Sequence, residues 1–228
     1  YGVVLGAFLH MFLQIPSLVS VGYRWRPVVD VSSAGFRKIA KMFIPRIFSM
    51  DAGQIGLLIA TVIGSSLASG SIAVYNLTSD LQAIPLGIVA VSFAIAAFPY
   101  LSEAVAKKDN ETYKEVFNGT LSQILFVIIP VSALMIVLRA QIIRVILGTG
   151  KFDWGATVAT IEAFQYFCIG LFAQALIYLL IRAFFAIEDS KTPFFVGIFG
   201  SVIAVVMAFI FANSLKVAGI SLALSIGS

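Results

Sequence analysis

The chain has 228 residues, of which 60% are hydrophobic and 11% are charged, and its formal net charge at pH 7 is +4. Because soluble domains contain about 25% charged residues, this composition excludes a soluble globular protein and predicts a membrane-embedded one. No basic run is dense enough to indicate a nucleic-acid partner, and a lone cysteine, Cys168, excludes a disulfide framework within the chain. The chain begins and ends inside apolar runs and lacks an initial Met, so we expect it to be an internal part of a longer membrane protein.

Long apolar runs predict the architecture, because a membrane-spanning helix needs about 20 mostly apolar residues. Backbone groups in lipid must satisfy their own hydrogen bonds, and these runs are too long and too uniform for the strands of a membrane β-barrel. The predicted fold is therefore all-α, a polytopic transmembrane helix bundle. It has about seven spans or partial spans, at 2–21, 43–67, 72–100, 117–138, 156–187, 194–212 and from about 217 onward.

The second predicted span contains Arg46, Asp51 and Gln54. A charged group at mid-bilayer costs about 3 kcal/mol or more, so such groups usually face a cavity or a partner. Asp51 and Gln54 are three residues apart and share one helix face. Two interpretations stay open for each charge: Arg46 either snorkels at the helix end or reaches Asp51, and Asp51 either lines a polar cavity or forms a structural pair.

The third predicted span contains Asp80, a carboxylate with long uncharged segments on both sides. Pro85 and Gly87 follow it and are expected to break the helix, and Pro99 is expected to end the span. Broken helices in transporters often line the substrate route. Asp80 is therefore a candidate for a polar pathway, facing a cavity or pairing with a basic residue.

The segment between the fourth and fifth spans combines Arg139 and Arg144 with four aliphatic residues. This pattern predicts a short amphipathic helix at the membrane interface, ended by Gly148 and Gly150, or else an ordinary linker. Trp154 fits an interfacial anchor.

The fifth predicted span contains Gln174, Tyr178 and Arg182 at a spacing of four, which places them on one helix face. The stripe either lines a transport pathway or binds a neighbouring helix. Glu162 lies near the outer end of the same span, where water reaches it.

Basic residues in the loops predict the orientation of the chain in the membrane. Loops on one side carry nine of them, against four on the other, so the first side is predicted to be cytoplasmic. The nine are Arg24, Arg26, Arg37, Lys38, Lys41, Lys107, Lys108, Lys114 and Lys191, and the four are Arg139, Arg144, Lys151 and Lys216.

The sequence contains no nucleophile paired with a base, no metal-ligand cluster and no phosphate-binding glycine loop. It predicts neither an enzyme nor a bound cofactor or metal. A transport role fits these residues better than catalysis.

Three segments carry a family resemblance: GVVLGAFLHMFLQIPSL (2–18), IPRIFSMDAGQIGLLIATVIGSSLASGSIAVYNLTSDLQAIPLGIVAVSFAIAAFPYLSEA (44–104) and LLIRAFFAIEDSKTP (179–193). In their order and spacing they resemble the MurJ/MviN family of lipid II flippases. The resemblance implies a MATE-like exporter fold, in which two lobes face each other across a central cavity. Residues 1–21 would be the last helix of the first lobe, 22–42 a basic cytoplasmic loop, and 43–228 a truncated second lobe.

The resemblance also implies a function. The family moves an undecaprenyl-linked cell-wall precursor across the bacterial cytoplasmic membrane by alternating access. The expected partners are this precursor lipid and membrane lipids, and the coupling ion is unknown. Substrate or cavity candidates are Asp80, Asp51, Gln54, Arg46, Gln174, Tyr178 and Arg182.

The match fails at charged positions of the family pattern. A family arginine falls on Asp80, an acidic residue three positions later falls on Ala83, and acidic positions associated with sodium in some members fall on Ala60, Ala204 and Ala208. Two alternatives therefore stay open beside a lipid II flippase. One is a related exporter of another lipid-linked saccharide or of cationic small molecules, and the other is a non-transporting membrane scaffold.

Overall fold

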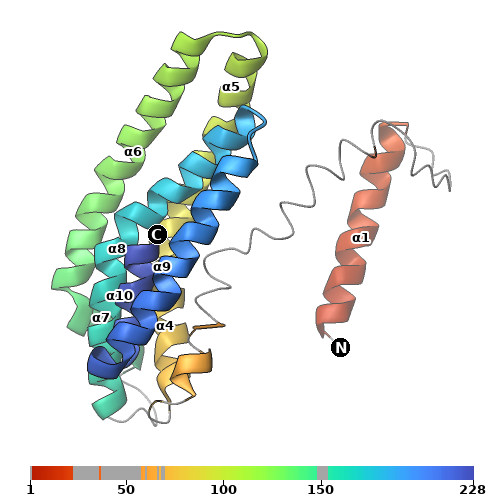
Figure 1. Ribbon diagram of the computed structural model, residues 1–228. Helices are drawn as coiled ribbons and strands as arrows, with labels where there is room; N and C mark the ends of the chain where they lie inside the picture. The colour runs from red at the N-terminus through yellow and green to blue at the C-terminus, as the bar shows by residue number, and fades with distance from the viewer. Residues whose placement is uncertain are drawn as a thin grey trace. The chain divides into compact units, whose positions relative to one another are not determined.

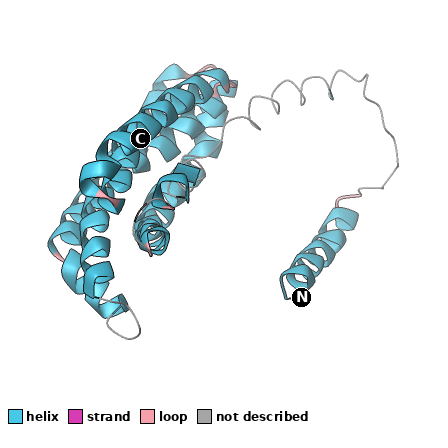
Figure 2. Cartoon of the chain, turned by 60° about the horizontal axis from the view of Figure 1, so that its bottom comes forward, coloured by secondary structure: helices cyan, strands magenta, loops and turns pink. Residues whose placement is uncertain are grey.

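A computed structural model describes residues 2–22, 36, 58–59, 61–65, 67, 70–147 and 154–228. The chain separates into two compact units, Tyr1–Lys41 and Met42–Ser228. All regular elements within the described ranges are helical, as the sequence predicts (Figure 1, Figure 2).

The first unit contains one described helix, α1 (Gly2–Ser20), which matches the first predicted span. Its large apolar side chains, among them Phe8 and Phe12, are exposed. The amide of Gln14 lies 3.3 Å from Nδ1 of His10 one turn earlier, so these two polar side chains pair with each other. Most of the second predicted span, 43–67, lies outside the described residues, although 58–59 and 61–64 are helical.

The second unit is a bundle of long helices joined by short turns (Figure 1). Within the described residues, four helices are long and apolar enough to cross a membrane, namely 71–106, 110–137, 154–186 and 191–215, and they confirm the third to sixth predicted spans. The elements are α4 (Ser71–Pro85), η1 (Leu86–Val91), α5 (Ser92–Ala106), α6 (Asn110–Val137), α7 (Arg139–Leu147), α8 (Trp154–Ala186), α9 (Lys191–Leu215) and α10 (Val217–Gly227).

The expected break after Pro85 takes the form of a change in helix type. α4, η1 and α5 form one continuous helix of 36 residues, in which η1 is a π-helical segment. Pro85 has no N–H, so the carbonyl four residues earlier loses its helical donor, and a wider turn accommodates the mismatch. The hydroxyl of Ser92 donates to the carbonyl of Gly87, five residues back, at 3.1 Å.

The prediction that Pro99 ends the third span is wrong. Pro99 lies inside α5, which continues to Ala106. Beyond the proline, Leu101 and Ala104 are buried, and Leu101 belongs to an apolar cluster with Ala183 and Ala186 of α8. This packing maintains the helix past a residue that costs it only one backbone hydrogen bond.

The turns α5–α6 and α8–α9 have the same construction. Lys108 and Glu188 each adopt a left-handed conformation, with φ of 57° and 60°. The next backbone N–H then reaches back five residues, which is the hydrogen-bond pattern of a Schellman helix end. These bonds join Asp109 to Ala104 at 2.9 Å and Asp189 to Phe184 at 3.0 Å.

The same two aspartates cap the helices that follow. Asp109 Oδ1 accepts from the backbone N–H of Thr112 at 3.0 Å, and Asp189 Oδ1 accepts from that of Thr192 at 3.1 Å. The backbone N–H and hydroxyl of Thr112 hold the pKa of Asp109 below its usual value. The hydroxyl and backbone N–H of Thr192 do the same for the pKa of Asp189.

α8 is the centre of the bundle and packs against every other described helix of the second unit. Apolar residues lie on every side of it except for the stripe of Gln174, Tyr178 and Arg182 and the exposed Glu162, as expected for a helix with partners on several sides. One layer of the core lies between α8, α6 and the α4–α5 helix. It consists of Leu86, Val89, Ala90, Ala94, Ile124, Ile128, Leu171, Ala175 and Leu179.

α10 packs closely on α8 and α9 through small residues. A Cβ placed on Gly170 of α8 would lie 2.5 Å from Cβ of Ser225, and one on Gly227 would lie 2.7 Å from Cβ of Ala204 in α9. The hydroxyl of Ser225 donates to the carbonyl of Tyr166 at 2.8 Å. Small side chains allow the helix backbones to approach this closely. Close packing matters here because lipid gives no hydrophobic driving force to helix association, so van der Waals contacts must supply the energy.

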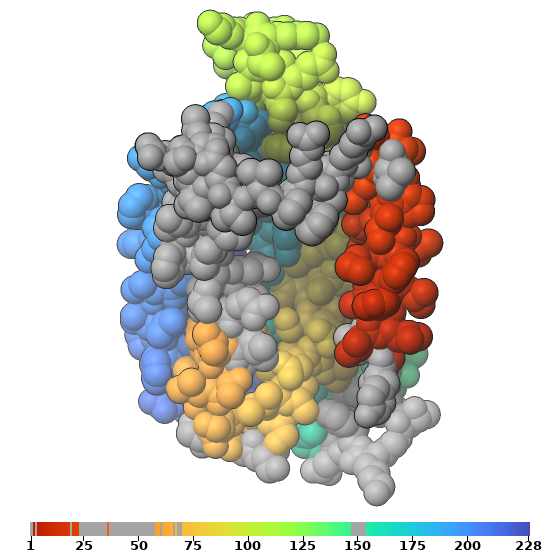
Figure 3. Space-filling model, turned by 90° about the vertical axis from the view of Figure 1, so that its right-hand side faces the viewer, coloured from red at the N-terminus to blue at the C-terminus, as the bar shows by residue number. Residues whose placement is uncertain are grey.

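The two ends of the bundle carry different turns. The α5–α6 and α8–α9 turns, with Lys107, Lys108 and Lys191, lie at one end, while α7 and the α9–α10 turn at Lys216 lie at the other (Figure 1). This arrangement agrees with the loop sides predicted from the basic residues. The α5–α6 turn extends farther than the α8–α9 turn, and its light-green atoms project at the top of Figure 3.

Candidate functional site

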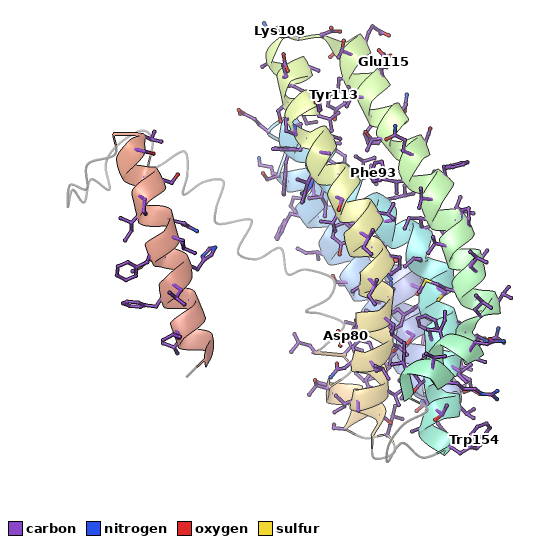
Figure 4. The ribbon with its side chains drawn as sticks, turned by 180° about the vertical axis from the view of Figure 1, so that it is seen from behind. Asp80, Phe93, Lys108, Tyr113, Glu115 and Trp154 are labelled. Atoms are coloured by element: carbon purple, nitrogen blue, oxygen red, sulfur yellow. The ribbon has the colours of Figure 1, made fainter. Side chains whose placement is uncertain are left out.

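Asp80 lies on the exposed face of α4 (Figure 4). The same face carries Asn76 one turn earlier and the small residues Ala73, Ala83 and Gly87, which leave the carboxylate prominent. Asp80 forms no hydrogen bond or ion pair with any residue in the described part of the chain. A charge at this depth requires water or a partner, so its place in a polar pathway stays a prediction.

The opposite face of α4 carries a second polar side chain, Gln82. Two residues turn an α-helix by about 200°, so Gln82 points away from the Asp80 face. Gln82 is 3% exposed, and its amide Nε2 donates to Oε1 of Gln174 on α8. This side-chain bond connects α4 to the central helix just before the π-helical segment.

Gln174 was predicted from its stripe on the fifth span, whereas Gln82 was not. The structure brings Gln174 against a neighbouring helix, on the side of α4 away from Asp80. An amide two residues after Asp80 in an otherwise apolar run is the signal that identifies Gln82.

Tyr178 and Arg182 continue the α8 stripe from Gln174. Tyr178 is half-buried and packs against the core layer formed by α6, α8 and the α4–α5 helix. Arg182 is also half-buried, and its Nε is fully buried with no hydrogen-bond partner among the described residues. Glu162, nearer the other end of α8, is exposed, as the sequence predicts.

The predicted candidates Arg46, Asp51 and Gln54 lie outside the described residues. Of the positions where the family pattern has acidic residues, Ala204 and Ala208 are buried in α9 and belong to the cluster with α10. Ala60 lies outside the described part. The described residues contain no group of three or more His, Cys, Asp and Glu that would hold a metal ion.

The predicted amphipathic segment is the helix α7, with Arg144 in its last turn. The guanidinium carbon of Arg144 lies 5.8 Å from the centre of the Trp154 ring, where α8 begins. A cation over an indole ring is attracted by the electron density of its face. The pair forms a compact polar and aromatic end to the bundle, and the interfacial role of Trp154 is consistent with it.

Long apolar helices, a core of small and aliphatic residues, and charged turns at both ends define a multi-pass helical membrane protein. Comparison with known families makes the class more specific. The sequence model of the family described as "Lipid II flippase MurJ" matches residues 1–228, the whole chain. The chain belongs to the lipid II flippase MurJ family.

Individual relatives agree with this assignment. The chain is 26% identical over 228 residues to a probable lipid II flippase MurJ of Buchnera aphidicola subsp. Baizongia pistaciae, covering 100% of this chain and 44% of the relative. It is 27% identical over 231 residues to a probable lipid II flippase MurJ of Vibrio cholerae, covering 100% and 43%. The chain thus spans less than half the length of these relatives.

A solved structure is also similar. It is described as "Lipid II flippase MurJ, inward closed conformation", and it matches with a TM-score of 0.76 at 26% identity, covering 98% of this chain and 46% of that one. These matches to bacterial proteins and the apolar helices identify a multi-pass protein of the bacterial cytoplasmic membrane.

Proposed function

We propose that the chain is part of a flippase that moves lipid II, the lipid-linked peptidoglycan precursor, across the cytoplasmic membrane. The observation that carries the proposal is the match of the whole chain to the lipid II flippase family, together with the fold shared with a solved member. The proposed process is transport by alternating access, without a chemical step.

The proposed division of the chain follows the family arrangement. Residues 1–21 form the last helix of a first lobe, 22–42 a cytoplasmic loop, and 43–228 most of a second lobe. The second unit of the structure, Met42–Ser228, has the packed core that a lobe needs to move as a body.

The proposed pathway runs along the exposed face of α4. Asp80 and Asn76 supply polar groups there, and small neighbours leave room for a headgroup. Behind this face, the Gln82–Gln174 contact positions α4 on α8. We assign Asp51, Gln54 and Arg46 to the same polar pathway, and Tyr178 and Arg182 to the α8 stripe that continues the contact.

The π-helical segment η1 is the proposed point of bending. Its hydrogen-bond register differs from that of α4 and α5, and such segments are weak points at which helices change direction. Bending there would move the Asp80 half of the helix relative to the α5–α6 hairpin while both halves stay helical. A lobe that rocks around a cavity needs a change of this kind at its wall.

Complementation tests the proposal. The full-length protein is expected to sustain growth of cells depleted of their own lipid II flippase. Asp80→Arg, which restores the basic residue of the family pattern, is expected to support growth, and Asp80→Asn is expected to lower it. Glu111→Gln, which also removes a carboxylate but at an exposed site in the first turn of α6, is the matched control.

Failure of the expressed full-length protein to sustain growth would contradict the proposed function. Equal growth with Asp80 and Asp80→Asn would remove Asp80 from the pathway and leave the transport proposal intact. Resistance to cationic compounds without rescue would instead indicate an exporter of cations.

A further inference from the structure

A groove lies between α5 and α6 at the end of the bundle that carries the α5–α6 turn. Its volume is about 370 Å³, within the roughly 300–1,000 Å³ of small-molecule sites. Aromatic residues Phe93 and Tyr100 line it from α5, and Glu115, Thr120 and Gln123 line it from α6. Figure 4 labels Phe93 and Glu115 on the two helices that border it.

The groove begins at the membrane interface. The hydroxyl of Tyr113 on α6 donates to the carbonyl of Ala183 at 3.1 Å, one turn before α8 ends at Ala186 and the charged turn follows. Glu115 lies close to this level, and Gln123 is eight residues further along α6, about 12 Å deeper at 1.5 Å per residue. The groove therefore runs from headgroup level into the hydrocarbon layer.

Glu115 differs from the other acidic residues of the α5–α6 hairpin. Glu103 pairs with Lys107 at 2.6 Å, and Glu111 pairs with Lys114 at 3.3 Å. Asp109 caps α6. Glu115 has no ion pair or hydrogen bond with any described residue, and it faces the groove.

Gln123 is the second unsatisfied polar group of the groove. It is exposed on α6 at a depth where lipid chains are the surroundings, and its amide has no hydrogen-bond partner within the described ranges. The nearby Thr120 hydroxyl already donates to the carbonyl of Val116 at 2.8 Å. A free amide facing lipid costs energy unless a ligand oxygen accepts from it.

We propose that this groove binds a phospholipid with an ethanolamine headgroup, phosphatidylethanolamine. The ammonium group pairs with the Glu115 carboxylate beside the ring of Tyr100, which attracts cations, while Phe93, seven residues from Tyr100 and so about 10 Å deeper, lines the wall of the groove. The Gln123 amide donates to an oxygen of the glycerol ester region, and an acyl chain continues along the apolar wall. An anionic headgroup such as phosphatidylglycerol fits less well, because Glu115 would repel it.

Native mass spectrometry of the full-length protein tests the proposal. The protein is titrated with phosphatidylethanolamine and with phosphatidylglycerol of the same acyl chains. Phosphatidylethanolamine is expected to bind more tightly, and Glu115→Gln is expected to weaken its binding about tenfold, the effect of one hydrogen bond to a charged group. Gln123→Leu is expected to weaken it too.

Glu111→Gln is the matched control, since it makes the same change one turn earlier, outside the groove, and is expected to leave the binding unchanged. Thermal unfolding of each variant shows that it is folded. Equal binding of the two lipids, unchanged binding by Glu115→Gln, or an equal loss in Glu111→Gln would each overturn the proposal. An effect of Glu115→Gln on the lipid-linked precursor alone would overturn it as well.

Discussion

Gly170→Ala is expected to destabilise the bundle, because the new methyl group has no space between α8 and α10. Its Cβ would lie 2.5 Å from both Cβ and Oγ of Ser225 and 2.9 Å from its Cα. Contacts below 3.0 Å require movement, and the backbone atom means that α10 itself must shift. A side-chain rotation alone does not relieve the clash.

The size of the expected destabilisation follows from two unfavourable effects and one favourable effect. Overpacking of a dense core costs typically 1–3 kcal/mol. A shift of α10 also stretches the hydrogen bond from Ser225 to Tyr166, and interhelical bonds in membranes contribute on average about 0.6 kcal/mol. Replacing Gly by Ala in a helix returns about 1 kcal/mol of helix propensity. The expected net loss in the free energy of unfolding is roughly 0.6–2.6 kcal/mol.

Gly197→Ala is the control for helix propensity. Gly197 lies in α9, and a Cβ there would meet no atom within 4 Å. This variant is expected to be as stable as the parent protein or more stable, by up to about 1 kcal/mol. The free energy of unfolding of the full-length variants is measured by denaturation with SDS in mixed micelles. If Gly170→Ala were stabilised as much as Gly197→Ala, the close packing of α8 against α10 would be refuted.

Three further expectations concern single contacts. Replacing Gln82 or Gln174 alone by Leu is expected to lower the free energy of unfolding by about 1 kcal/mol or more, because the other amide, buried at Gln82 and partly buried at Gln174, is left without its partner. In a double-mutant cycle the second substitution should cost much less, and additive losses would contradict the contact. The pKa of Asp189 is lowered in the folded state, so its stabilising effect is present above the unfolded pKa and is lost as pH falls through the folded pKa. Asp189→Asn keeps an acceptor for the cap, and acid titration of its unfolding should show a weaker pH dependence over that range than the parent protein shows. Tyr113→Phe removes the bond to the Ala183 carbonyl and is expected to cost about 0.6 kcal/mol in the same unfolding assay, while a loss several times larger would mean that the ring itself is displaced.

The spans were predictable because their length and apolar composition are local properties of the sequence. The predicted span at 194–212 lies inside α9, which continues at both ends with mainly polar residues. The predicted span at 117–138 ends one residue past α6, which begins earlier, at Asn110, with a polar segment. Hydropathy identifies the segment inside the membrane, whereas the helix continues until a cap or a turn stops it. The prediction that Pro99 ends the third span failed for a related reason: a proline ends a helix only where packing does not maintain the helix beyond it.

The contacts between helices were not predictable in the same way. Gln174 was recognised as polar within an apolar helix, but its partner Gln82 is 92 residues away in sequence. Only the packing of α4 on α8 brings the two together. The helix geometry at Pro85 also depends on this packing. The missing N–H of a proline permits a kink, an interruption of the helix or a π-helical turn, and the structure has the π-helical turn.

The candidate pathway at Asp80 could be predicted from the sequence only in part. The sequence predicts that Asp80 needs a polar environment, and the structure places it on the exposed side of α4, opposite the helix's packed face. An exposed carboxylate among small side chains is what α4 would contribute to the proposed pathway.

Translocation of fluorescent lipid II in proteoliposomes tests the central claim most directly. Vesicles that contain the full-length protein are expected to move the labelled precursor between leaflets faster than protein-free vesicles, and Asp80→Asn is expected to slow this movement while Glu111→Gln leaves it unchanged. Movement no faster than in protein-free vesicles, with correctly folded and inserted protein, would contradict the account.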